Sequence, residues 1–303
     1  MMVRLIYEPS VYLVGATASL VHAGRLPSDG GVVEFLSDGG HSEAWWKTVP
    51  DDGDPEPIEP SCGEAIAELA GRLCYQSYNN PRPGGTQAYI SHILEVGHGS
   101  VLEHAVYNFV FTGVSRSLTH ELVRHRAGFG FSELSQRYCD MSETAFVVPP
   151  HLADVVHAGE KYVASRNFRG KRTALRLARM YVGRHCGKDS LEAAGVEFIY
   201  SCGTAAQIYE DLVARLAAGG LDRKAARGAA RAVLPECVET QICVTGNARA
   251  WRNFIDQRAS HAADAEIRRL AVRVLEVLRC HSPYIFGDYT IQDGAASSPH
   301  RKV

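Results

Sequence analysis

The sequence predicts an α+β fold, a helix-rich single domain built around a mixed or antiparallel sheet. Two observations predict this class. Segments with helical periodicity dominate, and the few strand-like segments do not alternate regularly with helices, as they would in a doubly wound parallel sheet. The chain has 303 residues, of which 46% are hydrophobic and 22% charged. That composition is typical of a globular protein and supplies enough apolar surface for a sizeable core.

The expected elements begin after an acidic, proline-rich loop at residues 51–60. Ser61 and Glu64 fit a capping box at the start of a helix, and Thr86 is expected to cap a second helix, over residues 87–96, which Gly97 ends. Strands are expected at residues 106–111 and 237–245. Further helices are expected at residues 115–126 (closed by Gly128), 205–218, 222–232, 248–257 and 261–279.

Composition excludes several classes of protein. The net charge of −2, from 32 basic and 34 acidic residues, indicates no general affinity for polyanions. No apolar run reaches the roughly 18 residues of a membrane span, and no targeting segment is recognisable, so we expect a cytoplasmic protein with no membrane partner. The eight cysteines include no C-x-x-C pair, and free thiols in a reducing compartment are expected.

One segment is exclusively basic. Residues 161–188 hold nine basic residues and no acidic one. A solvated helical face is the favoured interpretation, and a docking surface for a polyanion is the alternative. The basic residues are Lys161, Arg166, Arg169, Lys171, Arg172, Arg176, Arg179, Arg184 and Lys188.

Several familiar motifs fail on spacing. The segment HELVRH, from His120 to His125, is one residue too long for H-E-x-x-H, because histidines five apart lie about 140° from each other around a helix. No metal site is predicted. The segment GFG at residues 128–130 lacks the third glycine of a dinucleotide fingerprint, and the chain has neither a Walker loop nor G-x-S-x-G.

The informative stretch runs from Arg124 to Tyr138. It places Arg124, His125 and Arg126 in succession, and Ser135 and Arg137 follow after a glycine-bearing turn. Three successive side chains cannot share one face of a helix, but at a helix end they can address several groups at once. Cations in a last helical turn also favour the helix dipole, which is the simpler explanation for the first three. Together with Ser135 and Arg137, however, they suit the phosphate and carbonyl oxygens of a nucleotide.

This stretch resembles the signature of flavin-dependent thymidylate synthases, the ThyX family, which is written R-H-R, seven residues, then S. This chain has eight residues, 127–134, in that interval, and residues 140–190 are enlarged. The resemblance covers roughly residues 61–286. Other segments resemble the family's motifs in the same order: HGSVLEH at residues 98–104, RAVLP at 231–235, NARAWRNF at 247–254, then Arg258 and SHA at 260–262.

The resemblance implies roles for individual residues. Arg258 would be catalytic, lying near N3 and O2 of the pyrimidine, where a fixed cation stabilises negative charge on the ring. Ser135 would bind substrate and not act as a nucleophile, because no paired base is evident. The nucleotide dUMP would contact Glu121, Arg124, Glu133, Leu134, Ser135, Gln136, Arg137, Arg231 and Arg258. The cofactor FAD would contact His98, Ser100, Glu103, Arg124, His125, Arg126, Glu133, Asn247, Arg249 and Asn253.

The resemblance also implies the reaction and the domain organisation. We expect C5-methylation of dUMP to dTMP, with methylenetetrahydrofolate as carbon donor and NADPH-reduced FAD as reductant. A specialised UMP or dual UMP/dUMP methylase is the alternative, and a non-catalytic nucleotide- or RNA-binding protein is a distant one. Residues 61–290 would form the catalytic domain, 1–60 an extension packed on it, and 291–303 a flexible tail. Family members are homotetramers with shared active sites, and nucleic acid is not an expected partner.

Overall fold

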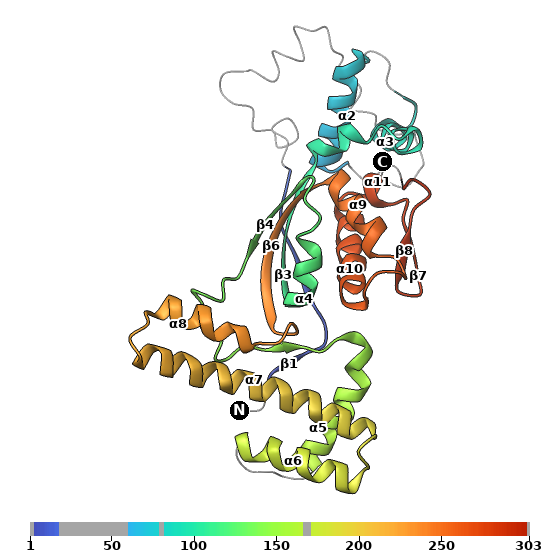
Figure 1. The fold of residues 1–303 in the computed structure, drawn as a ribbon. Helices are drawn as coiled ribbons and strands as arrows, with labels where there is room; N and C mark the ends of the chain where they lie inside the picture. The colour runs from blue at the N-terminus through green and yellow to red at the C-terminus, as the bar shows by residue number, and fades with distance from the viewer. Residues whose placement is uncertain (1–2, 18–59, 79–81, 166–170, 302–303) are drawn as a thin grey trace. The chain divides into compact units, whose positions relative to one another are not determined.

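The computed structural model describes residues 3–17, 60–78, 82–165 and 171–301 (Figure 1). Backbone contacts group the chain into two compact units that are interleaved in sequence. The first unit comprises Met1–Ser10, Phe111–Arg124 and Ser132–Ile242, and the second comprises Val11–Val110, His125–Phe131 and Cys243–Val303.

Helices dominate the described residues and strands are few, as the sequence predicts. The strands are β1 (Leu5–Ile6), β2 (Ser10–Ala16), β3 (Val106–Ser115), β4 (Phe129–Glu133), β5 (Phe146–Val147), β6 (Glu239–Asn247), β7 (Thr290–Gln292) and β8 (Ala295–Ser297). The helices are α2 (Cys62–Tyr75), α3 (Gly85–Val96), α4 (Arg116–Leu122), α5 (Ala153–Ser165), α6 (Lys171–His185), α7 (Leu191–Ala218), α8 (Arg223–Ala230), α9 (Ala248–Arg258), α10 (Ala265–His281) and α11 (Pro283–Phe286), with 3-10 helices η2 (Gly99–His104), η3 (Pro150–Leu152) and η4 (Arg231–Val233).

The described strands form one four-stranded sheet and two small ones, which confirms the α+β class. The large sheet has the order β2-β3-β6-β4. Along β3, Tyr107, Phe109 and Phe111 are buried while the residues between them are half-buried, as the two-residue period of a strand requires. Phe109 meets Trp251 of α9 edge to face at 5.0 Å, so this face of β3 belongs to the core of the second unit.

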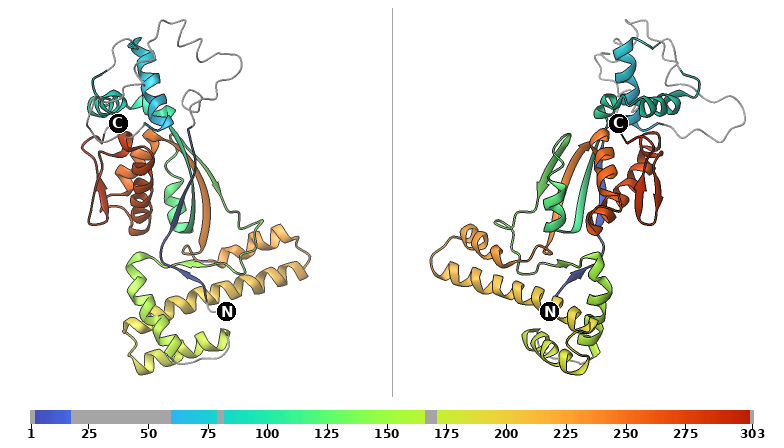
Figure 2. Two further views of the ribbon diagram at one scale, coloured as in Figure 1. Left: turned by 180° about the vertical axis from the view of Figure 1, so that it is seen from behind. Right: turned by 45° about the vertical axis from the view of Figure 1, so that its right-hand side comes forward.

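Helix α7 organises the helices of the first unit. Helices α5, α6 and α8 all pack against it, and both views of Figure 2 show α8 near one end of α7 and α5 and α6 near the other. The α5–α7 crossing is close because it is made at glycines. A Cβ atom on Gly195 would lie 2.1 Å from the carbonyl oxygen of Val155, so no larger residue fits there without a shift of the backbone.

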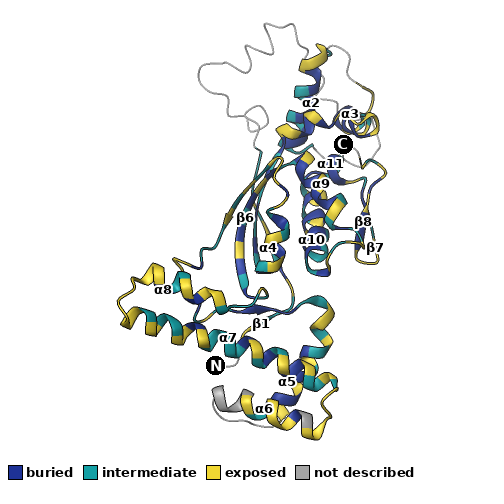
Figure 3. Cartoon of the chain, viewed as in Figure 1, coloured by how far each residue is buried: buried dark blue, intermediate teal, exposed yellow. Residues whose placement is uncertain are grey.

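The second unit buries α10 against α9 and α11. The buried residues of α10, among them Ile267, Leu270, Val274 and Leu278, recur every three or four positions and form one stripe (Figure 3). The capping box of α2 is confirmed. Ser61 Oγ accepts the N–H of Glu64, and Glu64 Oε2 accepts the N–H of Ser61 at 2.8 Å.

The predicted start of α3 is wrong, although its end is confirmed at Gly97. The helix begins at Gly85 after Gly84, whose φ is +91°. Thr86 lies inside the helix and its hydroxyl hydrogen-bonds the carboxylate of Glu68. A side chain that is committed to another helix cannot also cap its own, so the distant partner overrides the local signal.

The helix expected over residues 115–126 is also shorter than predicted, because α4 ends at Leu122. Gly128, with φ of +76°, does not close a helix but lies in the turn that leads into β4. Strand β4 was not predicted. It is held by distant pairing, with the Leu134 N–H just beyond it donating to the Gln241 carbonyl at 2.9 Å, and such pairing leaves little local trace in a sequence.

The two ends of the chain differ from expectation as well. Within the expected flexible tail, residues 291–297 belong to a hairpin, in which β7 and β8 pair antiparallel and bury Ala295 and Ala296. At the other end, β1 pairs parallel with β5 and β2 is a strand of the large sheet, so these residues are part of the sheets. The rest of the expected extension, residues 18–59, lies outside the described residues. No helix in the described part of the chain is long and apolar enough to cross a membrane.

Candidate functional site

The candidate residues divide between the two units by their expected ligand. Of the expected nucleotide contacts, all but Arg258 lie in the first unit. Of the expected flavin contacts, all but Arg124 and Glu133 lie in the second unit. Each unit therefore has its own set of polar side chains, and the two sets are described separately.

Helix α9 organises the set in the second unit. Its N-cap is Asn247, whose Oδ1 accepts the backbone N–H of Ala250 at 2.8 Å. A Cβ atom on Gly128 would lie 2.8 Å from Asn247 Nδ2, so only glycine lets the loop after α4 approach the start of the helix this closely. Asn247 thus combines a capping role with a place beside the R-H-R loop.

The exposed face of α9 carries two more candidates. Arg249 and Asn253 lie one turn apart and are both exposed. Arg249 Nη1 lies 2.7 Å from Glu103 Oε1 of η2, with side chains 45% and 48% exposed. An ion pair this exposed contributes little stability, so Arg249 can exchange the carboxylate for a phosphate at small cost.

This donor set fits a flavin nucleotide. Arg126 and Arg249 are exposed cations that suit a pyrophosphate, and Glu103 is an acceptor that suits the N–H groups of a base or flavin ring. His98 and Ser100 are likewise exposed, at the start of η2, which packs against α9. The second unit could therefore hold the phosphates and polar edges of such a cofactor.

The buried side of the R-H-R loop has a different character. His125 is 9% exposed, and its Nε2 accepts a hydrogen bond of 2.9 Å from Arg258 Nε at the end of α9. Burial and the charge of Arg258 lower the pKa of His125 to about 4. At neutral pH His125 is therefore an uncharged acceptor, and it does not act as a cation for phosphate.

In the first unit, the candidates cluster after β4. The carboxylate of Glu133 is held by α4, since Thr119 Oγ1 donates to one oxygen at 2.8 Å and Arg116 Nη2 to the other at 3.3 Å. The chain then turns, because the Ser135 carbonyl accepts the N–H of Cys139 at 2.9 Å. Among the described residues no base hydrogen-bonds the Ser135 hydroxyl, and its binding role stays a prediction.

Helix α8 holds this turn from the other side. Arg227 donates to the Tyr138 carbonyl at 2.7 Å and to Asp140 Oδ2 at 2.6 Å. Arg137 lies against the same helix, with its Cγ 3.7 Å from where a Cβ on Gly228 would be. Arg231 follows three residues after Gly228, on the same side of the helical turn, and is exposed. The two predicted phosphate-binding arginines thus share one surface.

Gln136 supplies an independent sign of a ligand. The residue is 5% exposed, and its Nε2 has no hydrogen-bond partner among the described residues. A buried amide donor without a partner costs free energy, so such a group usually has an explanation in a bound molecule or water. Its place between Ser135 and Arg137 fits a contact with a polar ligand.

Two arginines with structural roles were not predicted from the sequence. Arg227 and Arg252 bond to partners that lie 87 and 36 residues away. The only sequence signal for Arg227 is its position one helical turn before Arg231.

Glu121 and Arg124 lie together at the end of α4, where the Arg124 N–H donates to the Glu121 carbonyl at 3.3 Å.

The basic segment is described only in part, and the HELVRH motif contributes to no metal cluster among the described residues. The described basic side chains of the segment (Lys161, Arg176, Arg179, Arg184 and Lys188) are exposed, and Arg179 pairs with Glu197 at 2.6 Å. The side chains of Arg166, Arg169, Lys171 and Arg172 lie outside the described residues. Within the described part of the chain, no group of three or more His, Cys, Asp or Glu side chains could hold a metal ion.

Comparison with known proteins shows the family. Residues 60–284 match the family model described as thymidylate synthase complementing protein. The flavin-dependent thymidylate synthase of Mycobacterium tuberculosis (strain H37Rv) is 42% identical over 251 residues, covering 78% of this chain and 86% of that protein. The enzyme of the same name from Mycobacteroides abscessus is 44% identical over 237 residues, covering 77% and 83%.

A solved structure supports the fold. The UMP/dUMP methylase PolB from Streptomyces cacaoi, bound with 5-Br dUMP, superposes with a TM-score of 0.55 at 20% identity and covers 94% of this chain and 96% of that one. All candidate residues, from His98 to Arg258, lie within the segment matched by the family model. The chain therefore belongs to the flavin-dependent thymidylate synthase family.

Proposed function

We propose that this protein methylates C5 of dUMP to give dTMP, with methylenetetrahydrofolate as carbon donor, FAD as the flavin and NADPH as its reductant. Identity of 42% with flavin-dependent thymidylate synthases over most of the chain is the observation that carries the proposal. The donor set around α9 and the arginine surface of α8 support it, because they suit a flavin nucleotide and a phosphate. A reduced flavin, when bound, supplies the hydride that converts a methylene to a methyl group.

The residues of this chain would act on the nucleotide as follows. Arg137 and Arg231 bind the phosphate, because a guanidinium fork matches phosphate oxygens. Gln136 donates its buried amide, and Arg258 stabilises negative charge on the pyrimidine, which makes C5 a better nucleophile. Ser135 contributes binding only, because no paired base is evident that could activate its hydroxyl.

The proposal is tested by purifying the protein with and without added FAD. We expect a yellow protein that forms dTMP only when dUMP, methylenetetrahydrofolate and NADPH are all supplied. Replacement of NADPH by chemical reduction of the flavin should restore dTMP formation. A protein that binds no FAD and makes no dTMP under either condition would refute the proposal.

The phosphate role of the α8 surface yields a separate prediction. Arg137→Ala or Arg231→Ala should raise the KM for dUMP by about 10- to 100-fold, the loss of a charge-assisted hydrogen bond of about 1.5–3 kcal/mol. Because the phosphate is remote from C5, the KM for deoxyuridine, which lacks it, should change much less. Arg223→Ala, an exposed cation at the first residue of α8, is the matched control. Equal losses for both substrates would contradict the phosphate role.

A specialised UMP or dual UMP/dUMP methylase remains the second candidate function. The enlarged residues 140–190, which carry α5 and α6, and the longer interval before Ser135 motivate it. One extra 2′-hydroxyl is rejected by only about 10²-fold in a pocket that is not built to bind it. Comparison of kcat/KM for UMP and dUMP decides between the two, and a ratio favouring UMP would establish the specialised enzyme.

We also propose that the protein acts as a cytoplasmic homotetramer with active sites shared between subunits. All eight cysteines are free thiols in the structure, which suits a reducing compartment. Light scattering of the purified protein measures its mass in solution. A monomer that is fully active at nanomolar concentration would contradict shared active sites.

A further inference from the structure

The contact between His125 and Arg258 joins two segments that lie far apart in sequence. His125 belongs to the loop after α4, and Arg258 is the last residue of α9. The two residues are 133 positions apart, and both lie in the second unit. Arg258 Nε donates to His125 Nε2 at 2.9 Å, which is an ordinary hydrogen-bond length.

The imidazole is itself held firmly. It is buried, and the ring of Phe254 meets it edge to face at 5.4 Å with an interplanar angle of 81°. Phe254 lies one helical turn before Arg258 on α9, so the aromatic ring and the guanidinium approach His125 from the same helix. A buried ring between them has little freedom to turn, and it can serve as a fixed acceptor.

The geometry also decides the protonation of the ring. A nitrogen that accepts a hydrogen bond carries no proton, so the neutral ring must carry its proton on Nδ1. The lowered pKa of His125, about 4, agrees with a ring that stays neutral at working pH. With Nε2 already engaged, His125 offers a flavin at most the Nδ1–H group.

We propose that His125 is a positioning residue for Arg258: it accepts the Nε–H of the guanidinium and fixes the plane in which that cation meets the pyrimidine. The inference rests on the proposed function and adds to it a residue that acts through Arg258. Arginine has a long, flexible aliphatic side chain, and a hydrogen bond that fixes one nitrogen restricts the orientations of the planar guanidinium group. The flavin contact expected of His125 from the family resemblance is therefore secondary to this role.

Two variants of His125 distinguish the loss of its hydrogen-bond acceptor from a change in the size and shape of its side chain. His125→Phe keeps a planar ring but has no acceptor, whereas His125→Gln has a carbonyl oxygen that can reach the place of Nε2. We expect His125→Phe to lower kcat by about 10- to 100-fold, the range of a small misplacement at a reacting centre, with an unchanged Kd for FAD. His125→Gln should retain most of the activity. If Gln fails as badly as Phe while both variants melt like the parent, the acceptor role is wrong.

A double-variant comparison tests whether His125 acts through Arg258. When Arg258→Ala is already present, the further change His125→Phe should cost less than twofold in kcat, because there is no guanidinium left to position. If the two losses multiply instead, or if His125→Phe raises the Kd for FAD in the same proportion as it lowers kcat, the proposal is overturned and His125 is a flavin ligand.

Nitrogen NMR of the flavin-free protein provides a readout that needs no turnover. In ¹⁵N-histidine-labelled protein, His125 should show the Nδ1–H tautomer and titrate near pH 4, and Arg258→Ala should raise that midpoint because it removes a neighbouring positive charge. A midpoint near 6.5, or an Nε2–H tautomer, would refute the contact. A parent enzyme that makes no dTMP would refute the proposed function, while this measurement would still decide the contact.

Discussion

Arg258→Ala is expected to lower kcat for methylation of dUMP by about 10²- to 10³-fold, the usual cost of removing one group that stabilises charge at a reacting centre. The Kd for FAD should stay within about twofold. The physical reason is specific to a cation. Negative charge on the pyrimidine makes C5 nucleophilic, and a guanidinium, which stays protonated at any working pH, stabilises that charge without a proton transfer.

The control for this prediction is Arg279→Ala. Arg279 lies in the last turn of α10 and is exposed, so it shares with Arg258 the position of a cation at a helix end. Its loss should leave kcat unchanged. Rapid kinetics of flavin reduction by NADPH and of flavin reoxidation by dUMP and methylenetetrahydrofolate locates the defect, which should fall in the second step. Parallel losses of FAD binding and turnover would show that Arg258 is structural or a flavin ligand.

Local signals in the sequence were sufficient for many elements of this fold. The capping box of Ser61 and Glu64 and the stop at Gly97 each involve residues within four positions, and both are present. Elements held by distant partners were missed. Strand β4 depends on pairing that no window of a few residues contains. The β7–β8 hairpin was also missed, although its signal is local: residues 290–297 pair across the two-residue turn Asp293-Gly294, and both turn residues have a positive φ.

The candidate site shows the same difference between what local sequence signals predict and what depends on distant contacts. Family motifs identified the polar residues, but not which of them contact each other. The sequence places His125 with Arg124 and Arg126 as a run of cations, whereas burial leaves it uncharged and hydrogen-bonded to Arg258. Likewise, Arg227 looks like one more cation of α8 until Tyr138 and Asp140 are found beside it. Such roles follow from the environment, which the sequence pattern does not contain.

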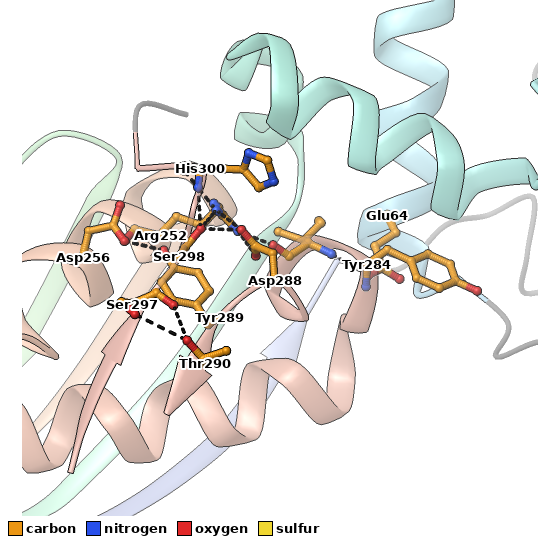
Figure 4. Close-up of polar contacts among 11 residues, drawn as sticks. Glu64, Arg252, Asp256, Tyr284, Asp288, Tyr289, Thr290, Ser297, Ser298 and His300 are labelled. Carbon is orange, nitrogen blue, oxygen red and sulfur yellow. Dashed lines mark hydrogen bonds and ion pairs between the residues drawn. The ribbon is translucent and has the colours of Figure 1, made fainter. Parts of the chain in front are cut away.

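Arg252 is the second residue whose loss should have a large effect, in this case on stability. It lies on α9 between Arg249 and Asn253 in the sequence, but unlike these two exposed residues it is only 1% exposed. Nη1 and Nη2 bond the two carboxylate oxygens of Asp288 at 2.7 and 2.8 Å (Figure 4). The same guanidinium also donates to the carbonyls of Ile285 and His300.

The partners of Arg252 lie almost entirely beyond the segment that matches the family model. That segment ends at residue 284, whereas Ile285, Asp288, Ser298 and His300 follow it. Ser298 Oγ donates to Asp288 Oδ2, and the Tyr289 ring stacks under the guanidinium at 4.8 Å from its centroid. The buried Arg252 is therefore one of the contacts that attach residues 285–300 to α9, together with the hydrogen bond from the Tyr289 hydroxyl to Asp256.

Arg252→Ala should lower the free energy of unfolding by about 3–5 kcal/mol, because it leaves the Asp288 carboxylate buried without its counter-charge. Arg268→Ala, which removes only an exposed hydrogen bond to the His261 carbonyl, should cost less than about 1 kcal/mol. Urea unfolding followed by circular dichroism measures both. Equal small losses would mean that the buried pair only balances its desolvation, and that the C-terminal segment is held by the apolar contacts of Ala295 and Ala296.

The pH dependence of the free energy of unfolding tests whether the Arg252–Asp288 pair stabilises the folded state. Burial opposes ionisation of Asp288, but the bonds from Arg252 outweigh it and hold the pKa of Asp288 below its usual value. A carboxyl group with a lowered pKa in the folded state adds stability above its unfolded pKa of about 3.9, and that stability is lost as the pH falls below it. Parent and Asp288→Ala stabilities should therefore converge in acid. If the difference between them stays constant below pH 4, the charge of Asp288 does not stabilise the C-terminal segment.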